Sequence, residues 1–309
     1  MVYLNLWPNI SSLDCLVVET KFDKQKYLED LISNYLEFKN KVVVFNSGRA
    51  AISCLIEHFG LKRENLIRIP RFSSTCLHVS AGRHCSTTDK NIKNDLQIVY
   101  KRWGNQIKYK KNNLTLQDCI DSLFTSKTNT LNGEYKLYSF SKLYGSPYGA
   151  FLLFQGEDEY KSLTKIRDLR INNSIFQYKL KKEIINKKNI NIDAYILYES
   201  YCGPLGNTYV DKIIKIFSKH KEIIELRKQR IEDLLEKQII VNSNFSDIPS
   251  CVILNNDYIR KEIIDLLPYL NIEKELDYDS SEMEKVYLLP IHQQINSKTY
   301  DFILSTLDK

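Results

Sequence analysis

One lysine interrupts an otherwise apolar stretch of the chain. The segment Leu137–Phe154, LYSFSKLYGSPYGAFLLF, contains two apolar runs joined by a Ser-x-Ser-Lys turn and a short Gly-Pro loop. Lys142 lies where the apolar pattern breaks, and an ammonium group between buried strands is costly to desolvate. A lysine amine of lowered pKa is suited to forming a Schiff base with an aldehyde. Lys142 is therefore the first candidate for a catalytic residue.

Two other places in the chain could support such chemistry. Ser47-Gly48-Arg49 lies between a short apolar run, Lys41–Asn46, and a stretch with helical spacing. The free N–H groups and the dipole at the start of a helix attract an anion. Asp118 follows another apolar run, and the carboxyl end of a buried parallel strand is a usual place for a functional residue. A helix N-cap or a turn is the alternative role for this aspartate.

These residues occur in the order that pyridoxal 5'-phosphate (PLP) requires. Its phosphate needs backbone donors and hydroxyls, which Ser47, Gly48, Arg49 and Ser139 could supply. Its pyridine nitrogen needs a carboxylate that keeps it protonated, and Asp118 is the candidate. Its aldehyde needs a lysine, for which we expect Lys142. The same amine, once released, could carry protons during amino transfer.

The apolar patterning predicts an α/β protein that could present these residues. We expect short buried strands at 41–46, 66–70, 96–100 and 114–117, with helices over 23–39 and 158–170. Only about a dozen residues separate Gly104 from Asp118, which leaves little room for a crossover helix. A long helix, or two abutting ones, is expected over 211–237. The pattern then predicts strand, helix, strand and helix at 250–254, 258–267, 286–289 and 297–307.

Bulk composition narrows the class of protein. The chain has 309 residues, of which 43% are hydrophobic and 27% charged, as is ordinary for a soluble globular protein. It contains no apolar run long enough for a transmembrane helix, and its first residues lack the pattern of a secretory signal. Its seven cysteines have no framework spacing. We therefore expect a cytoplasmic protein that has no membrane partner.

Neither the net charge nor the cysteines and histidines predict a nucleic-acid or metal site. The net charge is +6, and the chain has 20 Tyr and 13 Phe, so nucleic-acid binding has to be considered. However, Lys, Asn, Ile and Tyr are abundant together, as A/T-rich codons would cause, and the charge is scattered. We therefore expect no nucleic acid. Cysteines and histidines cluster between Cys76 and Cys85, but their spacing matches no zinc pattern, so no metal is expected.

Taken together, the motifs make the chain resemble the DegT/StrS family of sugar aminotransferases, which are PLP enzymes of fold type I. The resemblance covers nearly the whole chain, and the long helix with Arg227 and Arg230 resembles the stretch that joins the family's two domains. Five segments match family motifs in order: Ser47–Ile52 ("SGTAAL"), Ile67–Ser73 ("VLVPxYT"), Gln117–Ser122 ("EDxAxxxG"), Tyr138–Lys142 with Gly149–Phe151 (the lysine strand and "GGxxxT"), and Leu289–His292 ("LPxH").

The resemblance implies further site residues. Asp121 corresponds to a Gln or His beside the cofactor's phenolic oxygen, where a carboxylate could repel the phenolate. Ser74 lies near a position often held by an aromatic ring that stacks on the cofactor. Gly206-Asn207 resembles a loop whose Asn reaches the phosphate of a partner subunit, although a simple turn is an equally good interpretation. His292, in the LPxH match, is implied to bind substrate.

The resemblance also implies a fold and an activity. We expect a large PLP-binding domain, residues 1–225, with a mostly parallel central sheet flanked by helices, and a small α+β domain, residues 226–309. The implied reaction moves an amino group from an amino acid, glutamate in the first instance, to a nucleotide-linked keto sugar for bacterial surface polysaccharide synthesis. The implied assembly is a homodimer with a shared active site.

Some alternatives stay open at the level of sequence. Alignment on Ser-Phe alone would place the family lysine at Tyr144, and Lys136 is a second lysine nearby. The chain is shorter than the family it resembles between Gly82 and Asp118. A degenerate homologue that acts as a binding or structural partner is therefore an alternative function, as is an aminotransferase of another fold type I group. Sugar dehydratases of the family replace the lysine with histidine, so Lys142 argues against that reaction.

Overall fold

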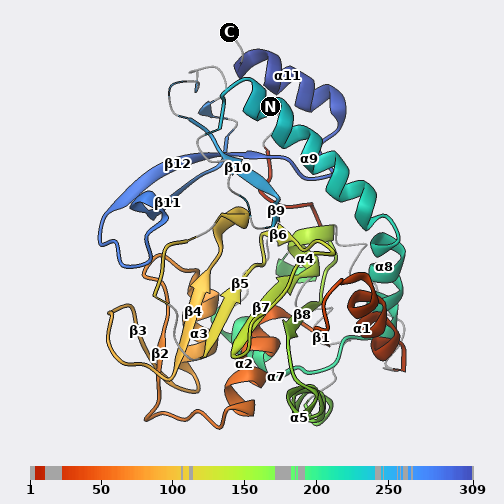
Figure 1. Cartoon of the computed structure of the whole chain (residues 1–309), viewed down its shortest axis with the longest axis vertical. Helices are drawn as coiled ribbons and strands as arrows, with labels where there is room; N and C mark the ends of the chain where they lie inside the picture. The colour runs from red at the N-terminus through yellow and green to blue at the C-terminus, as the bar shows by residue number, and fades with distance from the viewer. Residues whose placement is uncertain are drawn as a thin grey trace.

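A seven-stranded sheet forms the centre of the molecule (Figure 1). The computed structural model describes residues 4–10, 23–105, 107–110, 114–170, 182–184, 186, 192–240, 245, 247–255, 257, 259, 264–265 and 267–307. The strand order is β1-β8-β7-β5-β4-β2-β3. All strands are parallel except β8, which runs antiparallel to both of its neighbours, β1 and β7. The predicted α/β class with a mostly parallel central sheet is confirmed.

The strands of this sheet are short and, apart from the edge strand β3, mostly buried. Their bounds are β1 Lys41–Phe45, β2 Leu66–Arg68, β3 Ser86–Thr88, β4 Leu96–Tyr100, β5 Thr115–Asp118, β7 Glu134–Ser139 and β8 Ala150–Phe154. Alternate residues of β1 face opposite sides: Val42 and Val44 belong to one core cluster, Val43 and Phe45 to another. Helices cover both sides, which is why strands such as β1 and β8 are nearly continuous apolar runs.

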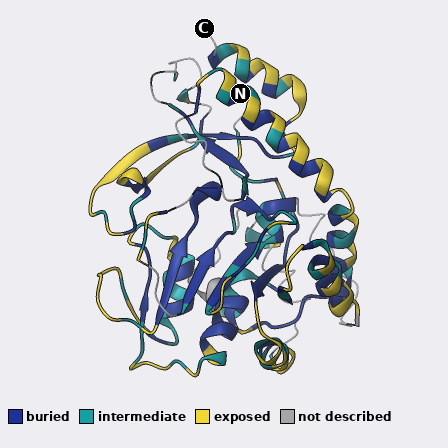
Figure 2. Cartoon of the chain, viewed as in Figure 1, coloured by how far each residue is buried: buried dark blue, intermediate teal, exposed yellow. Residues whose placement is uncertain are grey.

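Each face of the sheet has its own set of helices. Helices α2 (Gly48–His58), α3 (Thr75–Gly82) and α5 (Glu157–Asp168) share one core with the sheet. Helices α1 (Asp23–Tyr35) and α8 (Asn207–Phe217) share the core on the other face. Helix α7 (Ile192–Tyr201) contacts α2 and α3. Figure 2 shows the buried strands lying between helices whose outer faces are exposed.

The C-terminal part forms a second, smaller sheet. Strands β10 (Cys251–Ile253), β12 (Met283–Pro290) and β11 (Tyr269–Glu273) pair antiparallel in that order. Helices α9 (His220–Glu236) and α11 (Ser297–Leu307) contribute to its core. A two-stranded pair, β6 (Ser122–Leu123) with β9 (Ile248–Pro249), lies between the two sheets in Figure 1.

The 211–237 segment forms two abutting helices, which was one of the two expected forms: α8 ends at Phe217 and α9 begins at His220. Several other elements were not expected. The pattern did not predict α3, α7 or the strands β3, β6, β9 and β11. Between β4 and β5 the described residues form a short 3-10 helix, Arg102–Gly104, and no crossover helix, as the short spacing before Asp118 predicted. A further 3-10 turn, Lys274–Leu276, follows β11. The helix expected over 258–267 falls largely outside the described residues. Among described residues, no helix is long and apolar enough to cross a membrane.

Candidate active site

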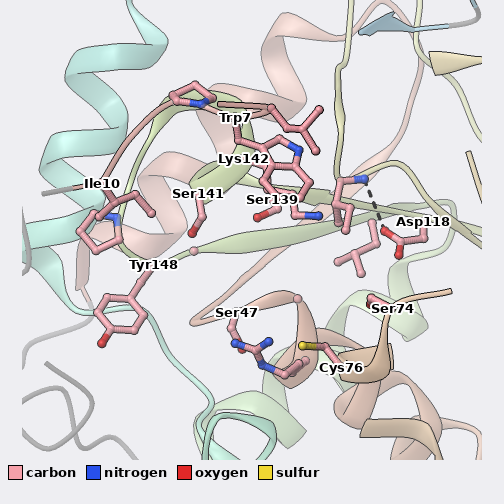
Figure 3. A pocket seen from close by; sticks show the side chains of 18 of the residues that line it. Trp7, Ile10, Ser47, Ser74, Cys76, Asp118, Ser139, Ser141, Lys142 and Tyr148 are labelled. Carbon is pink, nitrogen blue, oxygen red and sulfur yellow. Dashed lines mark hydrogen bonds between the residues drawn. The ribbon is translucent and has the colours of Figure 1, made fainter. Parts of the chain in front are cut away.

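Most of the predicted site residues meet at one edge of the large sheet. Because β1, β5 and β7 are mutually parallel, their carboxyl ends lie at the same edge, which is where α/β proteins bind ligands. Ser47 follows β1, Asp118 ends β5 and Ser139 ends β7. These three residues and Lys142 line one cavity of about 760 Å³ (Figure 3). The cavity also includes Gly48, Arg49 and Ser74.

Lys142 lies on α4 (Phe140–Tyr144), a short helix that follows β7. Its side chain is 26% exposed, and Nζ lies 3.2 Å from Asp121 Oδ1. Backbone contacts fix α4: the Phe140 N–H donates to the Gly149 carbonyl at 2.9 Å. Gly149 has φ +104°, and a Cβ there would lie 2.8 Å from Phe140 Cδ2, so only glycine fits without strain.

A buried arginine reinforces this helix from the C-terminal part. The Arg227 guanidinium donates to the carbonyl of Leu143 and to that of Pro249, each at 3.2 Å. Burial, with repulsion by Arg230, lowers the pKa of Arg227 to about 9, although Tyr144 and Cys251 oppose the shift. Arg227 thus ties α9 to the residue next to Lys142.

Asp118 is a buried carboxylic acid with little hydrogen bonding. It accepts a 3.4 Å bond from the backbone N–H of Ile120, which Figure 3 shows as a dashed line. Burial raises the pKa of Asp118 to about 7; Lys142 opposes this shift and Asp121 adds to it. A buried carboxyl at the end of the cavity is suited to pair with a ring nitrogen that carries a proton.

Asp121 is fully buried, and three donors surround it. Trp7 Nε1 donates to Oδ1 at 2.8 Å, Lys142 Nζ lies 3.2 Å from the same oxygen, and the Tyr100 hydroxyl donates to Oδ2. Burial and the neighbouring carboxylates raise the pKa of Tyr100 well above its usual value, so this phenol remains a donor. The charge of Asp121 is therefore compensated by its neighbours.

Across the cavity from Lys142, the wall is formed by the start of α2 (Figure 3). Ser47 caps this helix, and its Oγ accepts the N–H of Ala50 at 3.1 Å. Ser139 precedes α4, and its side chain makes no capping hydrogen bond. Arg49 forms a two-nitrogen ion pair with Glu199 of α7, and Tyr195 donates to the same glutamate. Coulombic attraction to Glu199 raises the pKa of Arg49 against the effect of burial.

The other predicted residues divide into two groups. Ser74 precedes α3, makes no capping hydrogen bond and lines the cavity. Asn207 and His292 do not line it. Asn207 is buried at the start of α8, 1% exposed in the single chain. His292 Nε2 lies 2.9 Å from the Asn5 carbonyl, and burial lowers its pKa to about 4. The neutral ring therefore donates to a residue that lines the cavity.

Sequence reasoning missed Trp7, Tyr100 and Glu199. Trp7 and Glu199 line the cavity, as do the other residues of 4–10, and Tyr100 contacts Asp121 from β4. Trp7 is one of only two tryptophans in the chain and precedes a proline, which is the one local signal that could have found it. Glu199 lies in a stretch without clear periodicity.

The donor set fits PLP. Hydroxyls and backbone N–H groups at Ser47, Gly48 and Ser139 suit a phosphate, the Asp118 carboxyl suits a pyridine nitrogen, and the partly exposed Lys142 amine suits an aldehyde. A Cβ added to Gly48 would meet only Leu137 Cδ2, at 3.6 Å. The turn at the start of α2 is therefore open towards a ligand.

Comparisons with known proteins indicate the same cofactor, PLP. A protein family described as "Putative PLP-dependent aminotransferase" matches residues 28–309. No curated protein sequence matches significantly. Among solved structures, Helicobacter pylori PseC, an aminotransferase involved in the biosynthesis of pseudoaminic acid, is similar with a TM-score of 0.63 and 11% identity, covering 99% of this chain and 98% of that one.

Two further structures show that the fold serves more than one reaction. S. venezuelae DesV, in complex with a ketimine intermediate, has a TM-score of 0.65 and 9% identity, covering 94% of this chain and 90% of that one. ColD, a GDP-4-keto-6-deoxymannose-3-dehydratase, has a TM-score of 0.60 and 15% identity, covering 93% of each chain. At such identities the likeness establishes a common fold.

Proposed function

This chain belongs to the family of PLP-dependent aminotransferases, and we propose that it acts as a sugar aminotransferase of the DegT/StrS type. The proposed reaction moves an amino group from an amino acid, with glutamate as the donor, to a nucleotide-linked keto sugar for surface polysaccharide synthesis. The similarity to PseC, whose name gives it a role in pseudoaminic acid biosynthesis, supports the sugar substrate. The similarity to ColD leaves dehydration as the competing reaction of the same fold.

The convergence of Lys142 and Asp118 in one cavity carries the proposal. When bound, PLP supplies an electron sink for the carbanion that amino transfer generates. Asp118 would hold a proton at the pyridine nitrogen. Ser47, Gly48, Arg49 and Ser139 would bind the phosphate. Lys142 would bind the aldehyde and then, as a free amine, move a proton between carbon atoms. A lysine here favours amino transfer over dehydration.

The test is a pair of lysine variants. We expect the purified protein with PLP to show a visible absorbance band that borohydride reduction removes while fixing the cofactor on Lys142. Lys142→Ala should lose this band and all amino transfer, because no other described lysine lines the cavity. Lys136→Ala is the matched control, since Lys136 lies on β7 outside the cavity, and it should retain both. Full turnover in Lys142→Ala would refute the assignment.

We also propose that the working form is a cytoplasmic homodimer built from a large domain, 1–225, and a small domain, 226–309. In this assembly Asn207 would reach the partner's phosphate, and His292 would contribute to substrate binding. Because Asn207 is 1% exposed in the single chain, reaching a partner requires α8 to present it differently. Sedimentation equilibrium of the PLP-loaded protein should give twice the chain mass of 36.3 kDa. A fully active monomer would remove this part of the proposal.

A further inference from the structure

The N-terminal segment, residues 4–10, contributes one wall of the cavity, and its Trp7 contacts Lys142. The Trp7 indole lies beside the lysine in Figure 3, with Lys142 Nζ 4.1 Å from the ring centroid. An ammonium group at this distance from an indole face is attracted by the ring quadrupole. Trp7 therefore contacts the reactive amine directly, from a part of the chain that precedes the whole large sheet.

Trp7 also reaches the same amine through Asp121. The indole N–H and the Lys142 ammonium both bind Oδ1 of this carboxylate, at 2.8 and 3.2 Å. Tyr100 occupies the other oxygen. Both carboxylate oxygens are thus engaged, and the group is fully buried, so its orientation is fixed by donors from three separate segments. The direction in which Lys142 Nζ points depends on that orientation.

We propose that Trp7 is a positioning residue for Lys142, which acts by fixing the Asp121 carboxylate and by covering the ammonium with its ring. This inference rests on the proposed function, since it assigns a role at the same site. Asp121 keeps two neutral donors, Trp7 and Tyr100, when Lys142 is engaged with a ligand. The predicted repulsion between Asp121 and a phenolate is thereby reduced, because the two donors spread the carboxylate's negative charge.

The wall that carries Trp7 is itself held in place. The Asn9 N–H donates to Gln294 Oε1 at 2.6 Å, and the Asn5 carbonyl accepts from His292 Nε2 at 2.9 Å. These two contacts flank Trp7 in the sequence. The indole is consequently anchored on both sides by contacts within the chain, as a positioning role requires.

A double-mutant cycle tests whether Trp7 acts through Asp121. The dissociation constant for PLP is measured from the visible band in wild type, Trp7→Phe, Asp121→Asn and the double variant. Phe keeps a ring but removes the N–H, so we expect Trp7→Phe to weaken binding about tenfold, as for the loss of a hydrogen bond to a charged group. In the Asp121→Asn background the same change should alter affinity by less than about twofold.

The control background is Tyr109→Phe, which removes a hydroxyl that binds Gln117 outside the cavity. There, Trp7→Phe should keep its full tenfold effect. Equal effects of Trp7→Phe in all backgrounds, or no effect in any, would overturn the proposal. Absence of PLP binding by the wild type would instead overturn the proposed function, so the two failures are distinguishable.

A second measurement uses the cofactor-free protein and leaves Asp121 unchanged, in case its variants do not fold. Lysines are labelled with trinitrobenzenesulfonate, and peptide mass spectrometry compares Lys142 with Lys136 in the same sample. Trp7→Ala removes the ring and its N–H, so labelling of Lys142 relative to Lys136 should accelerate several-fold. Trp7→Phe should give a smaller increase. An unchanged ratio in Trp7→Ala would contradict a positioning role.

Discussion

Two carboxylates three residues apart are placed in opposite environments. Asp121 has three donors around it, whereas Asp118, among the described residues, accepts one long backbone hydrogen bond. Burial therefore dominates at Asp118 and raises its pKa to about 7, despite the nearby Lys142. A carboxyl with this pKa is neutral in the cofactor-free protein at mildly acidic pH. A protonated pyridine ring would supply a positive partner at the carboxyl itself.

This environment predicts a pH-dependent stability of the cofactor-free protein. The folded-state pKa of Asp118, about 7, lies above its ordinary value of 3.8, so folding favours the protonated form. The stabilisation is complete below pH 3.8 and is lost as pH rises through 7. Asp118→Asn keeps a neutral side chain at every pH. Wild type therefore loses stability between pH 5 and pH 8, whereas Asp118→Asn does not lose this contribution. The free energy of unfolding of Asp118→Asn minus that of wild type should rise by about 3 kcal/mol from pH 5 to pH 8, at about 1.4 kcal/mol per pH unit.

Urea denaturation of both proteins at pH 5 and pH 8 measures this difference. Other titrating groups contribute equally to both proteins, so they cancel in the comparison. The control is Asp257→Asn, which changes an exposed carboxyl far along the chain and should leave the pH dependence as in wild type. A wild type and Asp118→Asn pair that respond equally to pH would show that Asp118 is ionised in the empty site.

At the scale of elements, the strands and helices that the sequence predicted correctly are those defined by a local pattern of apolar and turn residues. Strand β1 and helix α2 were expected because an apolar β-branched run precedes a Ser-Gly turn and helical spacing. Strands β7 and β8 were expected because Lys142 and the Gly-Pro loop interrupt two apolar runs, whereas the Ser-x-Ser-Lys segment, expected as a turn, forms the short helix α4. In both cases the residues that define the unit lie within 20 positions of one another, Lys41–His58 and Glu134–Phe154.

Elements and contacts that depend on distant partners were not predictable in this way. Trp7 meets Asp121 across 114 positions, and Arg49 meets Glu199 across 150. Strand β11 begins with three exposed residues, of which Tyr269 and Leu270 are apolar, so apolar residue type does not mark its buried face. The sequence also could not show that Asp121 is surrounded by donors. Repulsion between Asp121 and the cofactor's phenolate was predicted from the charge of the aspartate alone. In the structure, Tyr100 and Trp7 donate hydrogen bonds to that carboxylate.

At the scale of the whole molecule, residues near the two ends of the chain meet at the site. His292 and Gln294, which follow β12 of the small sheet, bind the backbone of Asn5 and Asn9. The low pKa of His292, about 4, keeps its ring neutral at physiological pH. The cavity wall therefore depends on contacts with the C-terminal part, although Lys142 and Asp118 come from the large sheet.

This arrangement predicts that a change at Gln294 loosens the cavity wall. Gln294 accepts from the Asn9 N–H at 2.6 Å and donates to its carbonyl at 3.3 Å, and both contacts are exposed. Gln294→Ala removes them, so the Asn9 amide should exchange its hydrogen about fivefold faster, as expected for losing about 1 kcal/mol of protection. Hydrogen exchange measured by NMR reports this amide directly.

The matched control is Gln294→Glu, which keeps an oxygen acceptor for the Asn9 N–H and loses only the weaker donated bond. Its Asn9 amide should remain close to wild type. The effect should also spread along the segment to Trp7, because Asn9 and Asn5 are the anchors on either side of the indole. Lysine labelling in Gln294→Ala should therefore rise at Lys142 and stay constant at Lys136. Unchanged exchange at Asn9 in Gln294→Ala would mean that the segment is held without Gln294.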